Sequence, residues 1–385
     1  MKIAFLTDGI PPYIIGGMQK HSLELAKELV LNGMDVDLFH FVQNNEKIPS
    51  SKEVNKLVFN RNLSFNKVFC TKFPSSIYFP GHYIWNSYKY SKWIFKIIYH
   101  DIEKYDFIYA KGFSAWKLMR IKQRKNLNIN IGIKFHGYEM FQRPANFRIK
   151  LEYLLLRPFV RWNNINADYV FSYGGKITSI IRSIGVPEIK IIEIPSGIQS
   201  TWIRNKDEIP LVIKHKLLFI GRNERRKAYL EICNAIVKVK NISLEFHFIG
   251  PFLENEKIRS DNHKIIYHGL IKDDLKKRNI IDQCDILLCP SYSEGMPNVI
   301  LEAMSRGLSI IASNVGAVSE LVNCKNGVLL DSNTSNDILN AIVKLLNLSN
   351  EDFLKMRLVS IDKIEVNYVW SKLVKKLNLE LQKLT

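Results

Sequence analysis

Two glutamates with seven residues between them, Glu294 and Glu302, mark the stretch of the sequence that is best suited to bind a ligand. They lie in residues 293–307, shortly after the stretch 285–289, whose apolar run after Asp285 is typical of a buried strand in a parallel sheet. Carboxylates accept hydrogen bonds from hydroxyl groups, and backbone N–H groups at a helix start bind anions. A ligand with several hydroxyls and an anionic group, such as a nucleotide-sugar, would suit both the carboxylates and the backbone N–H groups.

A helix must position these groups, and the sequence predicts one that begins at Pro297 and ends at Gly307. Proline is tolerated at the first helical position, and glycine commonly ends a helix. Three residues then place their amides at the helix N-terminus: Gly295, Met296 and Asn298. Glu294 lies on the loop before the helix, at the strand-end edge where open α/β sheets bind ligands, and Glu302 lies one or two turns inside.

A structural interpretation also exists, in which Glu294 caps the helix and Glu302 forms an ion pair on the surface. The whole spacing, E-G-x-P-x-x-x-x-E-A-x-x-x-G, resembles the signature of a large family of retaining glycosyltransferases. This family, called family 4 or group 1, includes bacterial sugar transferases and sucrose synthase. The resemblance implies that Glu302 binds the ribose of a nucleotide-sugar. It also implies that Glu294, the helix-start amides and Pro297 form the part of the site that holds the sugar.

Arg222 and Lys227 follow a second predicted strand, residues 216–220, and are suited to hold a diphosphate. Arginine offers a planar fork of donors, whereas lysine acts as a point charge. A basic run is usually a solvated face, but this one resembles the family's G-R-x-x-x-x-K-G motif, which binds the donor diphosphate. Ala228 replaces the last glycine of that motif, and we expect this change to be tolerated if a helix has already begun there.

His136 ends another predicted strand, residues 128–135, and resembles the family's histidine motif, whose histidine lies beside the donor sugar. There it could hydrogen-bond a sugar hydroxyl and stabilise developing charge, so His136 and Glu294 are the candidate catalytic residues. Gly16 and Gly17 follow the first predicted strand. By themselves they indicate a flexible turn, but the family carries a similar Gly-Gly near the donor phosphates.

The length of 385 residues predicts two domains, and strand-helix alternation predicts the α/β class. The resemblance implies the GT-B architecture, in which two doubly wound Rossmann-like domains face a central cleft. We expect an acceptor-binding domain with its linker, a nucleotide-sugar-binding domain, and a C-terminal helix that crosses back to the first domain. Their predicted ranges are 1–206, 207–366 and 367–385. Ser196 and Gln199 depart from the family's N-G-[VI]-D sequence before the linker.

The net charge of +18 is concentrated in the first half of the chain. Residues 1–206 contain 30 Lys and Arg against 15 Asp and Glu, whereas the remainder contains 25 against 22. Such a field could attract an anionic acceptor, anionic lipid or nucleic acid, or it could have no special partner. Residues 44–100, rich in aromatics and lysine, and the basic helix predicted over 146–162 each suit either a membrane surface or packing within the protein. We expect Pro158 to interrupt that helix.

The five cysteines form no C-x-x-C pair, and we expect reduced, mostly buried thiols of a cytosolic protein. The sequence shows neither a secretory signal nor a run of 18 apolar residues. We therefore expect a cytoplasmic protein that could lie peripherally on the inner face of the plasma membrane.

Together these features predict transfer of a sugar from a nucleotide-sugar to an acceptor hydroxyl. The family implies retention, and we expect neither a metal nor another cofactor, because no D-x-D-like acidic pair ends a strand. The expected acceptor is a saccharide, linked to a polyprenyl diphosphate, of a surface polysaccharide such as O-antigen, capsule or lipopolysaccharide. The alternatives are a nucleotide-sugar epimerase and a non-catalytic nucleotide-sugar-binding protein. A nucleic-acid partner is not expected, because no recognition-helix motif is present.

Overall fold

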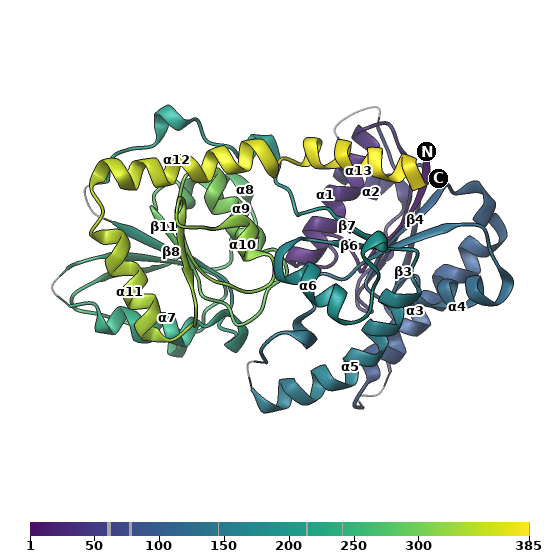
Figure 1. Ribbon diagram of the computed structural model, residues 1–385, viewed down its shortest axis with the longest axis horizontal. Coiled ribbons are helices and arrows are strands. Elements are labelled where there is room, and N and C mark those ends of the chain that lie inside the picture. The colour runs from purple at the N-terminus through teal and green to yellow at the C-terminus, as the bar shows by residue number, and fades with distance from the viewer. Residues whose placement is uncertain (60–62, 77–78, 145, 213–214, 241, 385) are drawn as a thin grey trace. The chain divides into compact units, whose positions relative to one another are not determined.

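The computed structural model describes residues 1–59, 63–76, 79–144, 146–212, 215–240 and 242–384 (Figure 1). Its chain divides into two compact units. The first unit comprises Met1–Phe141, Arg148–Ser196 and Trp370–Thr385, and the second comprises Gln142–Phe147 and Gly197–Val369.

In the described part of the first unit, seven parallel strands form one sheet in the order β3-β2-β1-β4-β5-β6-β7. The strands are β1 (Lys2–Leu6), β2 (Asp35–Val42), β3 (Lys67–Lys72), β4 (Phe107–Lys111), β5 (Asn130–Lys134), β6 (Tyr169–Ser172) and β7 (Ile191–Glu193). The strand order reverses between β1 and β4. In doubly wound sheets, ligands bind beyond the carboxyl ends of the strands at such a point.

Helices connect these strands and cover the sheet. They are α1 (Gly17–Leu31), α2 (Ser51–Val58), α3 (His82–Ile98), α4 (Trp116–Lys125), α5 (Phe147–Asn166), α6 (Gly175–Ser183) and α13 (Trp370–Leu384). The last helix of the chain, α13, lies in this first unit. Its buried Trp370, Val374 and Leu381 belong to the same apolar core as Phe5 of β1 and Leu25 of α1.

The second unit repeats the plan, with six described parallel strands in the order β10-β9-β8-β11-β12-β13. They are β8 (Lys216–Ile220), β9 (Glu245–Ile249), β10 (Lys264–Tyr267), β11 (Ile286–Cys289), β12 (Ser309–Ser313) and β13 (Gly327–Leu330). The helices are α7 (Tyr229–Lys238), α8 (Asp274–Ile281), α9 (Asn298–Ser305), α10 (Val318–Leu321), α11 (Ser335–Leu346) and α12 (Asn350–Asn367). Here the order reverses between β8 and β11, the strands that precede the Arg222 and Glu294 motifs.

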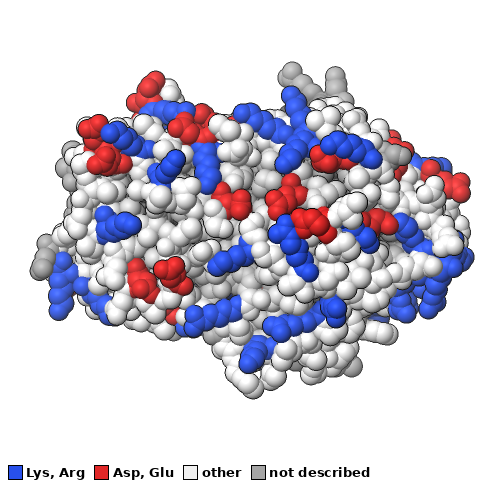
Figure 2. Space-filling view, in the orientation of Figure 1, with Lys and Arg blue, Asp and Glu red and all other residues white. Residues whose placement is uncertain are grey.

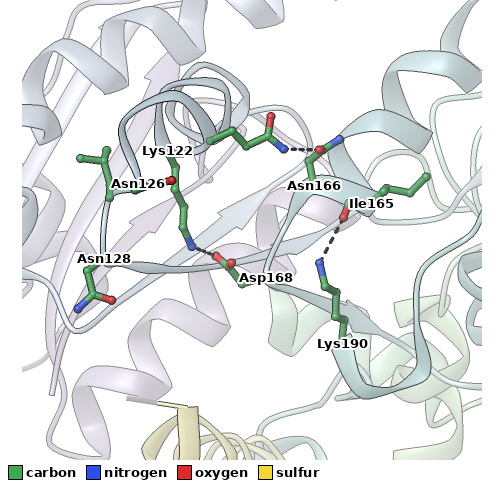
Figure 3. Close-up of a pocket in the computed structure, with 9 residues that line it drawn as sticks. Lys122, Asn126, Asn128, Ile165, Asn166, Asp168 and Lys190 are labelled. Atoms are coloured by element: carbon green, nitrogen blue, oxygen red, sulfur yellow. Dashed lines mark hydrogen bonds and ion pairs between the residues drawn. The ribbon is translucent and has the colours of Figure 1, made fainter.

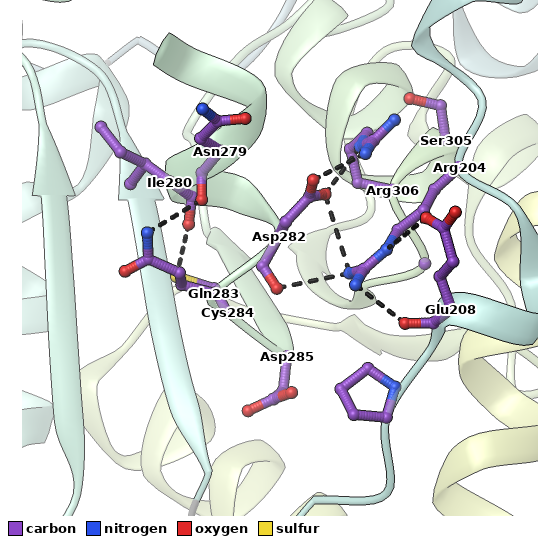
Figure 4. A network of polar contacts seen from close by, with 12 residues as sticks. Arg204, Glu208, Asn279, Ile280, Asp282, Gln283, Cys284, Asp285, Ser305 and Arg306 are labelled. Atoms are coloured by element: carbon purple, nitrogen blue, oxygen red, sulfur yellow. Dashed lines mark hydrogen bonds and ion pairs between the residues drawn. The ribbon is translucent and has the colours of Figure 1, made fainter. Parts of the chain in front are cut away.

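An arginine network fixes the start of the second unit to two of its helices (Figure 4). Arg306, just after α9, binds both oxygens of Asp282 at 2.6 and 2.7 Å. Arg204 donates to the backbone carbonyl of Asp282 at 3.3 Å and to that of Glu208 at 2.8 Å. The segment that enters this unit is therefore held against the ends of α8 and α9, close to where the unit's first strand begins.

The structure confirms the predicted class, two doubly wound α/β sheets, but corrects one local prediction. Residues 44–100, for which the sequence left two interpretations open, contain the regular elements α2, β3 and α3 within the first unit. The helix predicted to break at Pro158 continues through it to Asn166. The carbonyl that loses its amide partner belongs to Leu154, whose side chain is exposed, so water can reach that turn.

Two further predictions concern membranes and thiols. No helix within the described ranges is both long and apolar enough to span a bilayer. All five cysteines are free thiols, and three of them, Cys233, Cys284 and Cys289, are buried.

Candidate active site

Arg222 begins the site in the second unit, directly beyond the carboxyl end of β8. Its side chain is 63% exposed, and its Nη1 lies 3.3 Å from Glu224 Oε1. The backbone behind it is tightly packed, since a Cβ on Gly250 would come within 1.8 Å of the Gly221 carbonyl oxygen. An arginine that is exposed on a rigid strand end can turn its planar fork toward an anionic ligand.

Lys227 and Arg226 hold the carboxylate of Glu294. Lys227 Nζ lies 2.6 Å from Glu294 Oε1, and Arg226 Nη1 lies 3.3 Å from Glu294 Oε2. Only 8% of the Glu294 side chain is exposed, so the carboxylate is nearly buried between two cations. The structure thus brings together Lys227 and Glu294, which the sequence places in separate motifs.

The electrostatics of Glu294 follow from this geometry. Burial raises the pKa of its carboxyl, but the nearby charges of Lys227 and Arg226 lower it more, so the pKa lies below its ordinary value. Glu294 is therefore ionised at neutral pH. A buried carboxylate with two cations forms a preorganised polar site of the kind that can stabilise charge in a reacting ligand.

The backbone around Glu294 is fixed by close contacts. Gly316 adopts φ +55, and a Cβ there would lie 2.1 Å from the Glu294 carbonyl oxygen and 2.4 Å from that of Gly295. Ala317 N donates to Gly295 O at 2.7 Å, and Gln142 Nε2 donates to Glu294 O at 2.7 Å. The loop after β12 thus holds the Glu294–Gly295 turn, which requires glycine at position 316.

The helix that follows begins one residue later than predicted, with Pro297 as the N-cap and Asn298 as the first residue of α9. Met296 is buried, so its side chain anchors the turn while its backbone lies at the helix start. Glu302 is also buried and pairs with Lys277 of α8. Glu294 and Glu302 consequently have different cation partners, and the surface-pair interpretation of Glu302 does not hold, because only 6% of its side chain is exposed.

Ala228 departs from expectation, because no helix has begun at this position. It has φ +56 in the left-handed region and immediately precedes α7. Glycine favours that conformation, whereas alanine adopts it at a cost of about 1 kcal/mol. The 3-10 turn Arg225–Lys227, which presents the cations, is thus followed by a strained residue.

Several residues of this site were not identified from the sequence: Gln142, Arg225, Arg226, Glu231, Lys277 and Tyr292. Tyr292 donates to Glu231 Oε1 at 2.7 Å, and the Arg225 guanidinium lies 4.5 Å from the centroid of the Tyr292 ring. Tyr292 and Glu231 thus orient the cationic turn Arg225–Lys227. A glycine in a loop after a strand is a sequence signal for the positive φ of Gly316. The ion pairs of Glu294 and Glu302 have no such signal in the sequence.

The other predicted residues lie in the first unit. Gly16 is the N-cap of α1 with an extended φ of 178, and Gly17 is the first residue of that helix. His136 follows β5 and is half-buried. Its Nδ1 lies 2.7 Å from the Tyr173 hydroxyl, and its ring meets that of His21 edge-on with centroids 5.6 Å apart. Tyr173 and His21 were also not identified from the sequence.

A buried basic cluster supports this histidine. Lys111 Nζ lies 3.0 Å from His21 Nδ1, and Lys134 Nζ lies 3.8 Å from the Tyr173 ring centroid. Burial lowers the pKa of Lys111 to about 7, although Asp8 opposes this shift, and burial raises the pKa of Asp8 to about 7. Burial also raises the pKa of Tyr173 well above its ordinary value, so its hydroxyl stays protonated beside His136.

A separate cavity of about 570 Å³ lies at the opposite edge of the first sheet (Figure 3). Its residues Asn128 and Asp168 precede β5 and β6, whereas His136 follows β5. Lys122 is paired with Asp168 at 2.5 Å, and Lys190 donates to the Ala167 carbonyl at 2.9 Å. The cavity's cations are therefore held within the protein, and the cavity is not part of the predicted donor site.

Both parts of the chain match known families. Residues 15–202 match the family model described as Glycosyltransferase Family 4, and residues 214–348 match the one described as Glycosyl transferases group 1. The chain is 26% identical over 386 residues to the uncharacterized glycosyltransferase MJ1069 of Methanocaldococcus jannaschii, which covers 94% of this chain and 93% of that protein. It is also 26% identical over 268 residues to the Escherichia coli UDP-Gal:alpha-D-GlcNAc-diphosphoundecaprenol alpha-1,3-galactosyltransferase. That match covers 63% of this chain and 67% of the relative.

Among solved structures, the sucrose-phosphate synthase from Thermosynechococcus elongatus is similar with a TM-score of 0.77 at 18% identity. The similarity covers 100% of this chain and 98% of that one. It shows the GT-B fold that the sequence predicted.

Proposed function

We propose that this chain, a glycosyltransferase built from a family 4 domain and a group 1 domain, transfers a glycosyl group from a nucleotide-sugar to a saccharide hydroxyl with retention. The observation that carries this proposal is the nearly buried Glu294 carboxylate, held by Lys227 and Arg226 at the strand-order reversal of the second sheet. This is the edge at which doubly wound sheets bind nucleotides.

The donor's parts are assigned by chemistry. Arg222 and Lys227 bind the diphosphate, and Glu302 accepts hydrogen bonds from the ribose hydroxyls. Glu294 and the backbone at Gly295, Met296 and Asn298 bind the sugar. In this arrangement the diphosphate meets the exposed Arg222 fork first, while the sugar reaches the more deeply buried carboxylate. Donor binding redistributes the Lys227 charge between Glu294 and the diphosphate.

In the reaction, the bond between the anomeric carbon and the diphosphate oxygen breaks, and a bond to the acceptor oxygen forms. The acceptor's proton leaves with the nucleoside diphosphate. Arg222 and Lys227 stabilise the negative charge that develops on that leaving group, a role that a metal ion has in other sugar transferases. His136, oriented by Tyr173, is assigned a hydrogen bond to a sugar hydroxyl near the reacting carbon.

One relative and the positive charge of the first unit indicate the kind of acceptor. The E. coli relative is named for an acceptor joined to diphosphoundecaprenol, and the first 206 residues of this chain are strongly basic. We assign a polyprenyl-diphosphate-linked saccharide as the acceptor, in surface polysaccharide synthesis at the inner face of the plasma membrane. The basic first unit would attract such an anionic, membrane-bound substrate.

A thermal-shift panel of nucleoside-diphosphate sugars tests the donor site. One donor should raise the Tm of the wild type by mass action, and Glu294→Gln and Arg222→Ala should each abolish the shift. Glu254→Gln is the matched control, because Glu254 is an exposed carboxylate of the same unit paired with Lys257. If no donor shifts the wild type, or if both site variants respond like the control, the donor site is wrongly assigned.

The alternatives give different products. An epimerase would convert the donor sugar without any acceptor, and a non-catalytic binding protein would show the thermal shift but no turnover. Ser196, which departs from the family sequence, is buried at the end of the first unit, and Gln199 precedes the turn Ser200–Trp202. The proposal retains catalysis despite these two departures from the family sequence.

A further inference from the structure

Helix α5 exposes four large apolar side chains on its N-terminal half. Phe147 is 72% exposed, Leu151 49%, Leu154 45% and Leu155 50%. Single exposed apolar residues are common on protein surfaces, but a contiguous group on one helix marks an interaction site.

The four residues form one stripe along the helix. Their spacings of four, three and one place them on a single side, because an α-helix turns once in about 3.6 residues. On the other side, Ile149, Tyr153 and Leu156 are partly buried. In Figure 1 the N-terminal half of α5 lies at the lower edge of the picture, away from the strands of its sheet. The helix thus packs by one face and leaves the other uncovered.

Basic residues border the apolar stripe. Arg148 and Lys150 are exposed on its two sides. Farther along the helix, Arg157 and Arg161 are held by the protein itself, because they donate to the carbonyls of Met140 and Ile184. The acidic residue in this half of α5 is Glu152, which lies 3.4 Å from Arg148. The edge of Figure 2 where α5 lies is largely uncharged, with blue side chains at its border. This pattern is typical of helices that lie in the plane of an anionic membrane.

We propose that the N-terminal half of α5 docks on an anionic lipid surface, inserting Phe147, Leu151, Leu154 and Leu155 among the acyl chains. The exposed cations Arg148 and Lys150 then meet the lipid phosphates. The charge favours lipid over a second copy of this chain, because two copies would bring their own basic borders together. The inference rests on the proposed function for its purpose, since a lipid-linked acceptor must be reached at a membrane.

Sedimentation of the full chain with vesicles tests this docking without any substrate. The wild type should bind vesicles of equal parts phosphatidylglycerol and phosphatidylcholine at low salt, and release at high salt or with phosphatidylcholine alone. The double variant Leu151→Ser/Leu154→Ser should bind at least about tenfold more weakly, because it removes two apolar groups from the buried face. Its two sites are exposed, so the fold should survive.

Leu253→Ser/Leu270→Ser is the matched control, because it removes two exposed leucines from the second unit. It should bind vesicles as the wild type does. A charge variant, Arg148→Glu/Lys150→Glu, should lose the salt-sensitive part of binding. Equal binding by the wild type and the α5 double variant would overturn the proposal, as would an absence of binding by the wild type.

Two further measurements separate the possible explanations. If analytical ultracentrifugation shows a wild-type dimer that the α5 variant abolishes, and neither binds vesicles, the stripe is a self-association surface and the lipid proposal is overturned. The donor-induced thermal shift, measured on the same variants without vesicles, should be unchanged by the α5 substitutions. A wild type that shows the donor shift but does not bind vesicles therefore contradicts docking alone, whereas a wild type that binds vesicles without any donor shift contradicts the proposed donor site.

Discussion

Lys227 Nζ lies 2.6 Å from Glu294 Oε1, so two residues assigned to different parts of the donor are paired with each other in the ligand-free chain. Arg226 provides a second cation to the same carboxylate at 3.3 Å. The site is therefore held together by its own functional groups. A donor diphosphate must share Lys227 with Glu294, and Arg226 then keeps the Glu294 carboxylate in place.

Replacing Lys227 tests how much this pair stabilises the fold. Lys227→Met should lower the free energy of unfolding by about 1–2 kcal/mol, less than for a fully buried pair because Arg226 still compensates Glu294. Chemical denaturation measures this. Lys355→Met is the control, since Lys355 pairs with exposed Glu351, and it should change stability by less than about 0.5 kcal/mol. Equal effects of the two variants would contradict the structural role of the pair.

The pH dependence of stability should report Glu294. Its pKa in the folded chain lies below the ordinary value, so the stabilisation is present above the ordinary pKa and is lost as pH falls through the lowered one. Wild type should therefore exceed Glu294→Gln in stability at pH 7, and the difference should shrink below about pH 4.5. Urea unfolding midpoints across this range measure the difference. A gap that stays constant with pH would show that Glu294 is not held as a carboxylate.

Tyr173 should act on the reaction through His136. Tyr173→Phe removes the hydrogen bond to His136 Nδ1, and we expect kcat to fall about tenfold with little change in donor KM. Tyr169→Phe, on strand β6 just before Tyr173, is the control and should leave kcat unchanged. Steady-state kinetics with one donor and one acceptor provide the comparison. A rise in KM alone would mean that Tyr173 serves binding and does not orient the catalytic histidine.

Gly316 should fix the conformation of the Glu294–Gly295 turn, which is proposed to bind the donor sugar. Gly316→Ala places a Cβ against the carbonyl oxygens of Glu294 and Gly295, and donor affinity should fall by more than about tenfold. Gly269→Ala is the matched control, because Gly269 has φ +70 but nothing within 4 Å of an added Cβ. It should lower stability through backbone strain and leave donor affinity unchanged. Calorimetric titration with the donor distinguishes the two, and equal affinities would contradict the role of this loop.

Activity should not depend on a divalent metal, because Arg222 and Lys227 are assigned the leaving-group charge. Transfer rates measured after dialysis against EDTA should equal those measured before it. Loss of activity in EDTA, restored by Mg²⁺ or Mn²⁺, would show that a metal shares this role.

Much of the fold could be predicted because its signals are local. Apolar runs followed by glycine or polar turns mark strands such as β8 and β11, and helical spacing of apolar residues marks α1. The E-G-x-P segment could be placed at a helix start for the same reason, with an error of one residue at Pro297. Parallel strands then bring their carboxyl ends to one edge, so the Arg222 and Glu294 motifs were expected near each other.

What could not be predicted depends on contacts between distant segments. The sequence does not show that Arg226 joins Lys227 on Glu294, because side-chain pairing is set by the packed loops. The conformation of Ala228 could not be predicted from the sequence either, because alanine normally indicates a helix and here adopts a positive φ. For α5, the sequence left membrane and core interpretations open, and only the exposure of Leu151 and its neighbours separates them.

The most direct test of the proposed function is transfer itself. Labelled nucleotide-sugars should be incubated with the wild type and a polyprenyl-diphosphate-linked saccharide, and the lipid product measured. One donor should yield an extended lipid-linked saccharide. Glu294→Gln and Arg222→Ala should each lower the rate by about a hundredfold or more, whereas Glu254→Gln should not. Transfer at the wild-type rate by both site variants, or no transfer with any donor, would contradict the proposed function.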